Sequence, residues 1–190
     1  MQKPPHIVAV SETKINKNDG LSFPTTITGY NFLHSDSEKK SGGVRSYIDS
    51  SISYQIKTDI PNVLNDSESL WIEINLHKKP CIIGVIYRHP RYDISAFTEN
   101  MCEILRGDIN INLMQQNVIP QVRNYVNAYK SYKCLELITK PTRITPSSST
   151  LIDHIYTALP LDKLSPGILI NDLSDHLPIF VLIKPAHVKK

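Results

Sequence analysis

Two successive stretches of the sequence, Ser69–Leu76 and Pro80–Tyr87, point to a fold built on β-sheet. The first stretch alternates aliphatic residues with larger or polar ones, and this period of two predicts a strand with one buried face. The second stretch is an apolar run that ends at Arg88, which is typical of a strand buried on both faces. Both stretches are therefore predicted to be strands, the first half-buried and the second fully buried.

Shorter apolar segments predict further strands, and two helical patterns interrupt them. Helical spacing predicts a helix over Asp93–Leu105 with Asp93 as its cap, and a second over Val118–Tyr132 with Pro120 at its start. Many strands with few helices predict a layered α/β sandwich. The shorter predicted strands are His6–Val10, Tyr30–Leu33, Val44–Ile48, Leu135–Ile138, Asp153–Thr157, Ile168–Ile170 and Pro178–Lys184.

Length and composition limit the class of protein. The chain has 190 residues without a repeat or linker, so residues 1–190 are predicted to form a single domain. A formal net charge of +3 falls short of a strongly basic balance, so any affinity for nucleic acid must come from local patches. The widely spaced Cys81, Cys102 and Cys134 indicate a reduced, intracellular protein. We expect no membrane segment and no signal peptide.

A second signal is an ordered set of acids, an amide and a histidine. Asp108 and Asn110 are two residues apart, so both side chains would point to one face of an extended segment. Asp175 adds an oxygen ligand of the kind that Mg²⁺ prefers, and His176 can act as an acid, a base or a charged donor near neutral pH. Asp153 is a partner that can fix the tautomer of His176. The set predicts metal-assisted cleavage of a phosphodiester.

Simpler structural roles are open for these residues. Asp108 and Asn110 could shape a turn, and Asp175 could be a cap next to a surface histidine. A buried Asp153 needs a partner, for which His154 or a backbone donor is the alternative to His176.

Similar alternatives apply to the remaining candidates. Glu12 could be a solvated surface carboxylate, and Tyr87 could be a packing residue with a wet hydroxyl. Four basic residues could contact DNA phosphates beside the site, with a solvated rim as the alternative for each. They are Arg88, Arg91, Lys140 and Arg143.

Six short motifs, in this order, resemble those of the endonuclease/exonuclease/phosphatase superfamily. They are Ser11-Glu12-Thr13-Lys14, Gly42-Gly43-Val44, Tyr87-Arg88-His89-Pro90, Gly107-Asp108-Ile109-Asn110, Leu151-Ile152-Asp153-His154-Ile155 and Ser174-Asp175-His176. More narrowly, Thr139-Lys140-Pro141-Thr142-Arg143 leading into residues 149–154 is similar to the endonuclease domain of non-LTR (LINE-type) retrotransposons. The resemblance covers essentially the whole chain.

This resemblance implies a four-layer α/β/β/α sandwich, with two packed sheets and helices outside. The sequence departs from the family pattern at two places, so we expect the sandwich to be incomplete. A first strand should precede His6 and is absent, so that the chain would begin in the second strand. The strand that should lead into Asp108 is missing or shortened.

The resemblance also implies a role for each matching residue. Glu12 would be a ligand of Mg²⁺, with Mn²⁺ as the alternative ion, and Asp175 would serve the metal or the leaving group. In the remaining catalytic set, Tyr87 would lie near the scissile phosphate, Asp108 would position or deprotonate the attacking water, Asn110 would contact the phosphate, and Asp153 would support His176.

The implied activity is Mg²⁺-dependent hydrolysis of a phosphodiester that nicks target DNA. The implied partner is DNA, without a membrane or an obligate protein partner. A reverse transcriptase would be fused to the domain in the parent element, and a functional chain would act in the nucleus. Two alternatives stay open: an inactive or unstable remnant of such an element, and a superfamily phosphatase or phosphodiesterase with another substrate, such as a phosphoinositide, sphingomyelin or abasic-site DNA.

Overall fold

The computed structural model describes residues 4–13, 25–35, 42–58, 60, 67–76, 78–103, 111–171 and 174–184. The chain falls into two compact units, Met1–His89 and Pro90–Lys190. The assignment of the whole chain to a single domain stays a prediction. Within the described residues, no helix is both long and apolar enough to cross a membrane.

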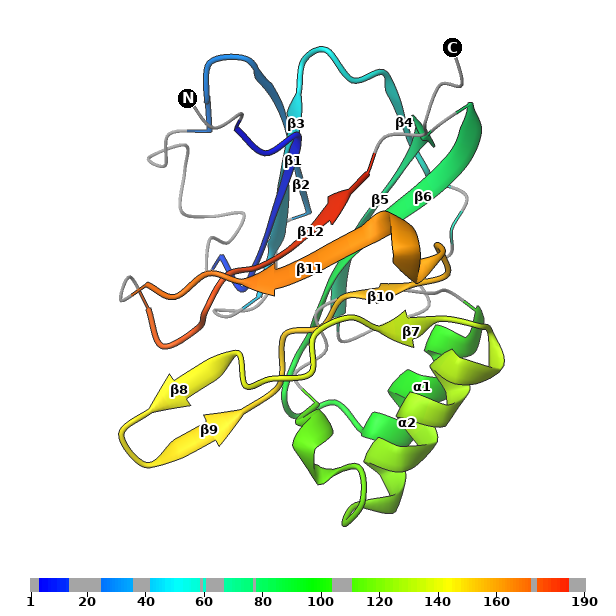
Figure 1. Ribbon diagram of the computed structural model, residues 1–190, viewed down its shortest axis with the longest axis vertical. Helices are drawn as coiled ribbons and strands as arrows, with labels where there is room; N and C mark the ends of the chain where they lie inside the picture. Colours follow the sequence, from blue (N-terminus) through cyan, green and yellow to red (C-terminus); the bar gives the residue numbers. More distant parts are fainter. Residues whose placement is uncertain are drawn as a thin grey trace. The chain divides into compact units, whose positions relative to one another are not determined.

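In the described part of the first unit, six strands form two antiparallel sheets (Figure 1). One sheet has the order β1-β3-β2 and the other the order β4-β5-β6. The long strands β5 and β6 pair along their full length, from Ser67 opposite Arg88 to Leu76 opposite Lys79. The strands are β1 (Ile7–Ser11), β2 (Tyr30–Ser35), β3 (Val44–Asp49), β4 (Tyr54–Ile56), β5 (Ser67–Leu76) and β6 (Lys79–Arg88).

The core of this unit lies between the two sheets and confirms the predicted apolar face of β5. Ile72 and Ile74 pack with Ile48 of β3, and Leu70 packs with Val44 and Tyr87. Each fully buried aliphatic side chain stabilises the fold by about 1.5–3 kcal/mol. This packing fixes the end of β6, where the predicted site residues Tyr87 and Arg88 are found.

Strand β6 is not fully buried, and here the prediction is wrong. Its burial is confined to Ile86–Arg88, whereas Ile82 is 41% exposed. Successive side chains of a strand point to opposite faces. Ile83 packs into the core cluster, whereas Ile82 is exposed. An apolar run therefore does not require that both faces be covered along the whole strand.

Trp71 packs closely against the backbone of β6. It lies opposite Gly84, and a Cβ atom at this position would collide with the indole ring. The side chain of Trp71 is thereby buried, with 5% of the residue exposed.

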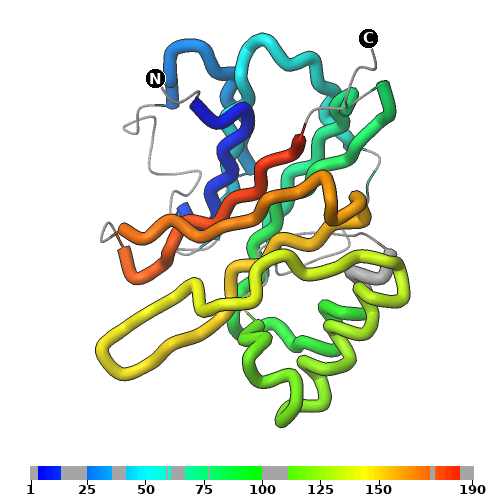
Figure 2. The backbone as a smooth tube through the Cα atoms, in the orientation of Figure 1, coloured from blue at the N-terminus to red at the C-terminus, as the bar shows by residue number. Residues whose placement is uncertain are grey.

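In the described part of the second unit, two α-helices lie side by side, as Figure 2 shows in green and yellow-green. They are α1 (Ile94–Glu103) and α2 (Pro120–Ser131). Both helix starts agree with the prediction: Asp93 Oδ1 accepts a hydrogen bond from the Ala96 amide at 2.9 Å, and Pro120 occupies the first turn of α2. Ile104 and Leu105, the predicted end of α1, lie outside the described residues.

Short antiparallel strand pairs make up the rest of the described part of this unit. The pairs are β7 (Leu135–Glu136) with β10 (Tyr156–Thr157), β8 (Arg143–Thr145) with β9 (Ser148–Thr150), and β11 (Leu164–Ile168) with β12 (Ile179–Ile183). Two short 3₁₀ helices, Leu113–Gln115 and Leu161–Lys163, complete the described elements.

Some strand predictions in this unit need correction. The strand predicted over Ile168–Ile170 lies earlier, as β11, and the hairpin of β8 and β9 was not predicted. The hairpin has no buried apolar face, since Ile144 is 52% exposed, so it lacks the alternation by which strands are recognised. The strand expected before Asp108 lies outside the described residues.

An aromatic cluster joins α2 to β10. Tyr125, Tyr129, Tyr156 and His154 are all at most 6% exposed, and the rings of Tyr129 and Tyr156 stack with centroids 4.0 Å apart. Burial raises the pKa of Tyr125 and of Tyr156 well above the ordinary value for a phenol. The cluster anchors the segment that carries Asp153. His154 belongs to this cluster through its ring contacts with Tyr125 and Tyr156.

Candidate active site

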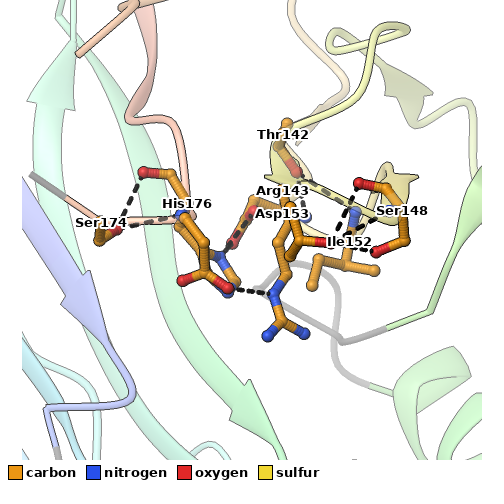
Figure 3. A network of polar contacts seen from close by, with 9 residues as sticks. Thr142, Arg143, Ser148, Ile152, Asp153, Ser174 and His176 are labelled. Carbon is orange, nitrogen blue, oxygen red and sulfur yellow. Dashed lines mark hydrogen bonds and ion pairs between the residues drawn. The ribbon is translucent and has the colours of Figure 1, made fainter. Parts of the chain in front are cut away.

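The second unit brings His176 and Asp153 together. The Nδ1 atom of His176 lies 3.1 Å from both carboxylate oxygens of Asp153 (Figure 3). A carboxylate can only accept a hydrogen bond, so Nδ1 carries the proton and Nε2 is the nitrogen that can exchange one. The side chain of Asp153 is 15% exposed and that of His176 is 31% exposed. A half-buried carboxylate thus orients an imidazole that solvent can reach.

Thr142 holds Asp153 in place, and its role was not foreseen from the sequence. Its Oγ1 accepts hydrogen bonds from the amides of Ile152 and Asp153, at 3.3 and 3.1 Å (Figure 3). Its backbone oxygen accepts from the Leu177 amide at 2.7 Å. Thr142 is fully buried, so one residue connects the segments that carry the two members of the pair. Of the strand predicted over Asp153–Thr157, the Asp153 amide is bonded to this hydroxyl, and β10 begins only at Tyr156.

The segment before His176 is attached to β8. Arg143 and His176 form an antiparallel bridge, and the Ile144 amide donates to the backbone oxygen of Asp175 at 2.9 Å. Ser174 Oγ accepts from the His176 amide and donates to the His176 backbone oxygen, both at 3.0 Å. These bonds fix the backbone from which the imidazole projects.

Arg143 and Asp175 form an ion pair beside this bridge. Arg143 Nε donates to Asp175 Oδ2 at 2.7 Å, and the two side chains are 47% and 43% exposed. The hydrogen bond from Arg143 lowers the pKa of the Asp175 carboxyl. Arg143 was predicted to contact DNA and Asp175 to bind a metal, so the structure pairs two residues for which different ligands were expected.

In the first unit, Glu12 follows β1 in a left-handed backbone conformation, with φ of +51°. Non-glycine residues rarely adopt this conformation, and it is often found at functional sites. The next residue, Thr13, donates its amide to the backbone oxygen of Gly43 at 3.3 Å. Gly42 lies against the carboxylate of Glu68, since a Cβ atom on Gly42 would be 2.7 Å from Glu68 Oε2.

Tyr87 and Arg88 lie at the end of β6 in the first unit and are almost fully buried, with 1% and 2% exposed. Tyr87 is paired across the strands with Glu68. Lys140, in the second unit, is exposed. The roles assigned to all three stay predictions.

Asp108 and Asn110 lie outside the described residues. The chain that follows them is attached to the Asp153 segment through Asn112. Asn112 Oδ1 accepts from the amides of Met114 at 3.2 Å and Leu151 at 3.1 Å. Asn112 was not singled out from the sequence, because one of its partners lies 39 residues away.

The donors predicted for a metal suit Mg²⁺ in kind, because carboxylate oxygens are the ligands that this ion prefers. The two of them, Glu12 and Asp175, belong to different units. Oδ2 of Asp175 is engaged by Arg143. Among the described residues, no group of three or more histidines, cysteines and acids is arranged to hold a metal.

No protein-family model matches the sequence, and a search of curated proteins gives no significant match. Solved structures do match. The endonuclease domain of TRAS1, a telomere-specific non-LTR retrotransposon, aligns with a TM-score of 0.66 at 12% identity, over 84% of this chain and 82% of that chain.

The catalytic domain of Xenopus laevis APE2 aligns with a TM-score of 0.65 at 17% identity, over 94% of this chain and 83% of that one. The 3′-5′ exonuclease NExo from Neisseria meningitidis aligns with a TM-score of 0.64 at 15% identity, over 95% of this chain and 90% of that chain. These likenesses confirm the predicted endonuclease/exonuclease/phosphatase fold, here with strands in several sheets and few helices.

Proposed function

We propose that this chain is a metal-dependent phosphodiester hydrolase that nicks DNA, of the kind found in non-LTR retrotransposons. The observation that carries the proposal is the pairing of His176 with Asp153, at 3.1 Å, on a fold shared with nucleases. DNA as substrate is supported by the neighbours, since a second structure of the Neisseria enzyme is bound to a product DNA hairpin. The likeness of residues 139–154 to the LINE-type domain supports the narrower assignment.

The reaction needs a water to attack phosphorus while the bond to the leaving oxygen breaks. The leaving oxygen takes up a proton, and the attacking water loses one. His176 would hold or donate a proton at Nε2, with Asp153 stabilising the charged imidazolium and fixing its orientation. Asp108 would position the water and Asn110 would donate to a phosphoryl oxygen.

Mg²⁺, or Mn²⁺, bound through Glu12 and Asp175, would stabilise negative charge on the phosphoryl oxygens. Tyr87 would lie near the scissile phosphate, and exposed Lys140 would contact the DNA backbone. In the parent element, a reverse transcriptase would be fused to this domain, and the nick would be made in nuclear DNA.

The deciding experiment is conversion of supercoiled plasmid to open circles by the purified chain, with Mg²⁺, with Mn²⁺ and with EDTA. We expect cleavage only with metal. His176→Ala should lower the rate by about 10²–10⁴, which is the usual contribution of a general acid or base. His6→Ala is the matched control, since His6 is an exposed histidine in the other unit.

Nicking in EDTA, or nicking by His176→Ala at the wild-type rate, would contradict the proposal. A panel with a duplex that contains an abasic site and a hairpin with a 3′-phosphate separates the substrate classes. Cleavage of these substrates alone would indicate another superfamily activity. No reaction on any substrate by a cooperatively folded chain would indicate an inactive remnant.

A further inference from the structure

We propose that Arg143 is a positioning residue for Asp175 and that its guanidinium competes with a divalent cation for the Asp175 carboxylate. This inference rests on the proposed function, because it concerns the metal of that reaction. In this inference Arg143 controls how tightly the site binds a cation, whereas the sequence predicted that it contacts DNA.

The first support is the geometry of the pair. Arg143 Nε and Asp175 Oδ2 are 2.7 Å apart, which is the short distance expected of a charge-assisted hydrogen bond. The backbones of the two residues are also joined, because the Ile144 amide donates to the Asp175 backbone oxygen and Arg143 is bridged to His176. The backbone pairing of β8 with the Asp175–His176 segment therefore holds these two residues side by side.

The second support is the weak stabilisation that such a pair gives. Both side chains are nearly half exposed, and exposed ion pairs contribute little to folding. The pair does, however, affect any cation that reaches Asp175. Arg143 engages one carboxylate oxygen and places a positive charge beside it, so a cation must bind against this charge or displace the guanidinium.

The test is calorimetric titration of Mn²⁺ into the DNA-free protein, without a cleavage reaction. In Arg143→Gln, we expect Mn²⁺ to bind about fivefold tighter or more, within the usual range of coupling between two ligands. Arg143→Lys retains the positive charge and should restore the wild-type affinity to within about twofold. Lys133→Gln, the matched control, removes an exposed positive charge elsewhere in the same unit and should leave the Mn²⁺ affinity unchanged.

A second variant shows that the effect passes through Asp175. In an Asp175→Asn background, the further change Arg143→Gln should alter Mn²⁺ affinity by less than about twofold. Unchanged or weaker Mn²⁺ binding by Arg143→Gln would overturn the inference, as would the absence of Mn²⁺ binding by both proteins. If the wild-type chain cuts DNA but Arg143→Gln binds Mn²⁺ with wild-type affinity, this inference fails and the proposed function is unaffected.

The salt dependence of DNA binding distinguishes this role from a phosphate contact. With a short labelled duplex in EDTA, the slope of log K against log salt should be the same for Arg143→Gln and the wild type. Loss of a phosphate contact reduces that slope by about 0.9. A reduction of this size in Arg143→Gln, with unchanged Mn²⁺ affinity, would return Arg143 to the DNA-binding residues.

Discussion

Thr142 is a residue that organises the candidate site without any charge of its own. Its buried hydroxyl accepts from two successive amides, and one of these amides belongs to Asp153. A donor left without a partner inside a protein costs about 1–3 kcal/mol. The position of the Asp153 carboxylate thus depends on a hydrogen-bond acceptor that is 11 residues away in the sequence.

Thr142→Val keeps the shape of the side chain and removes the acceptor. We expect the free energy of unfolding to fall by about 1–3 kcal/mol, measured by urea denaturation, together with a slower nicking rate. Thr142→Ser retains the hydroxyl and should recover most of both losses. Equal stability and equal nicking for the valine and serine variants would show that the two hydrogen bonds contribute nothing.

For individual residues, the sequence allowed a pair of side chains to be predicted more readily than a contact between a side chain and the backbone. The pairing of Asp153 with His176 could be anticipated because a buried carboxylate needs a partner. Thr142 could not be anticipated in the same way, because its partners are amides, which every residue carries. The ion pair of Arg143 with Asp175 was missed because each residue was assigned to a ligand outside the chain.

The 3₁₀ helix Leu113–Gln115 is joined to the Asp153 segment by Asn112. Its Oδ1 caps this helix through the Met114 amide and also accepts from the Leu151 amide. The Leu113 amide donates to the Leu151 backbone oxygen at 3.0 Å. The chain that follows Asp108 and Asn110 is therefore tied to the chain that leads to Asp153.

Asn112→Ser should separate these two functions of the side chain. Serine is a good cap for a helix but is too short to serve both amides. We expect faster hydrogen exchange of the Leu151 amide, measured by NMR, and a lower nicking rate, with Asn112→Asp close to the wild type. Wild-type exchange at Leu151 in the serine variant would refute the proposed link.

The aromatic cluster of α2 and β10 predicts a loss of stability at alkaline pH. The pKa values of Tyr125 and Tyr156 are raised by burial, so the native state keeps these phenol protons at a pH where the unfolded chain releases them. The stabilisation is complete below the ordinary phenol pKa of about 10 and decreases above it, by up to about 1.4 kcal/mol per pH unit for each tyrosine.

Urea denaturation at about pH 8 and about pH 11 measures this effect around the phenol pKa. In Tyr125→Phe, the decrease in the free energy of unfolding between these two pH values should be smaller, by the contribution of one ionising phenol. Tyr132→Phe is the control, because Tyr132 is 48% exposed. The same alkaline loss in Tyr125→Phe and the wild type would show that Tyr125 is not responsible.

Elements with a regular apolar pattern were predictable, and those held by polar contacts were not. Strand β5 and the start of α1 follow from alternation and from the Asp93 cap. The hairpin of β8 and β9 has no such pattern, since backbone pairs such as Arg143 with Thr150 define it. The burial of β6 was overestimated because a run of aliphatic residues does not reveal which face is covered.

For the whole molecule, the order of short motifs predicted the fold at a level of identity where overall sequence comparison finds nothing. Identity to the matching structures is 12–17%. Nothing comparable in the sequence marks the division at His89, since no linker composition accompanies it.

Trp71 is the only tryptophan of the chain, and its ring is packed on Gly84 in the first unit. Its fluorescence therefore reports on the unit Met1–His89, while the ring-proton resonances of His176 report on the unit Pro90–Lys190. The protein thus carries a separate spectroscopic reporter in each unit, without any label. Melting curves that coincide would show one cooperative folding unit, and curves that separate would show that each half can unfold while the other persists.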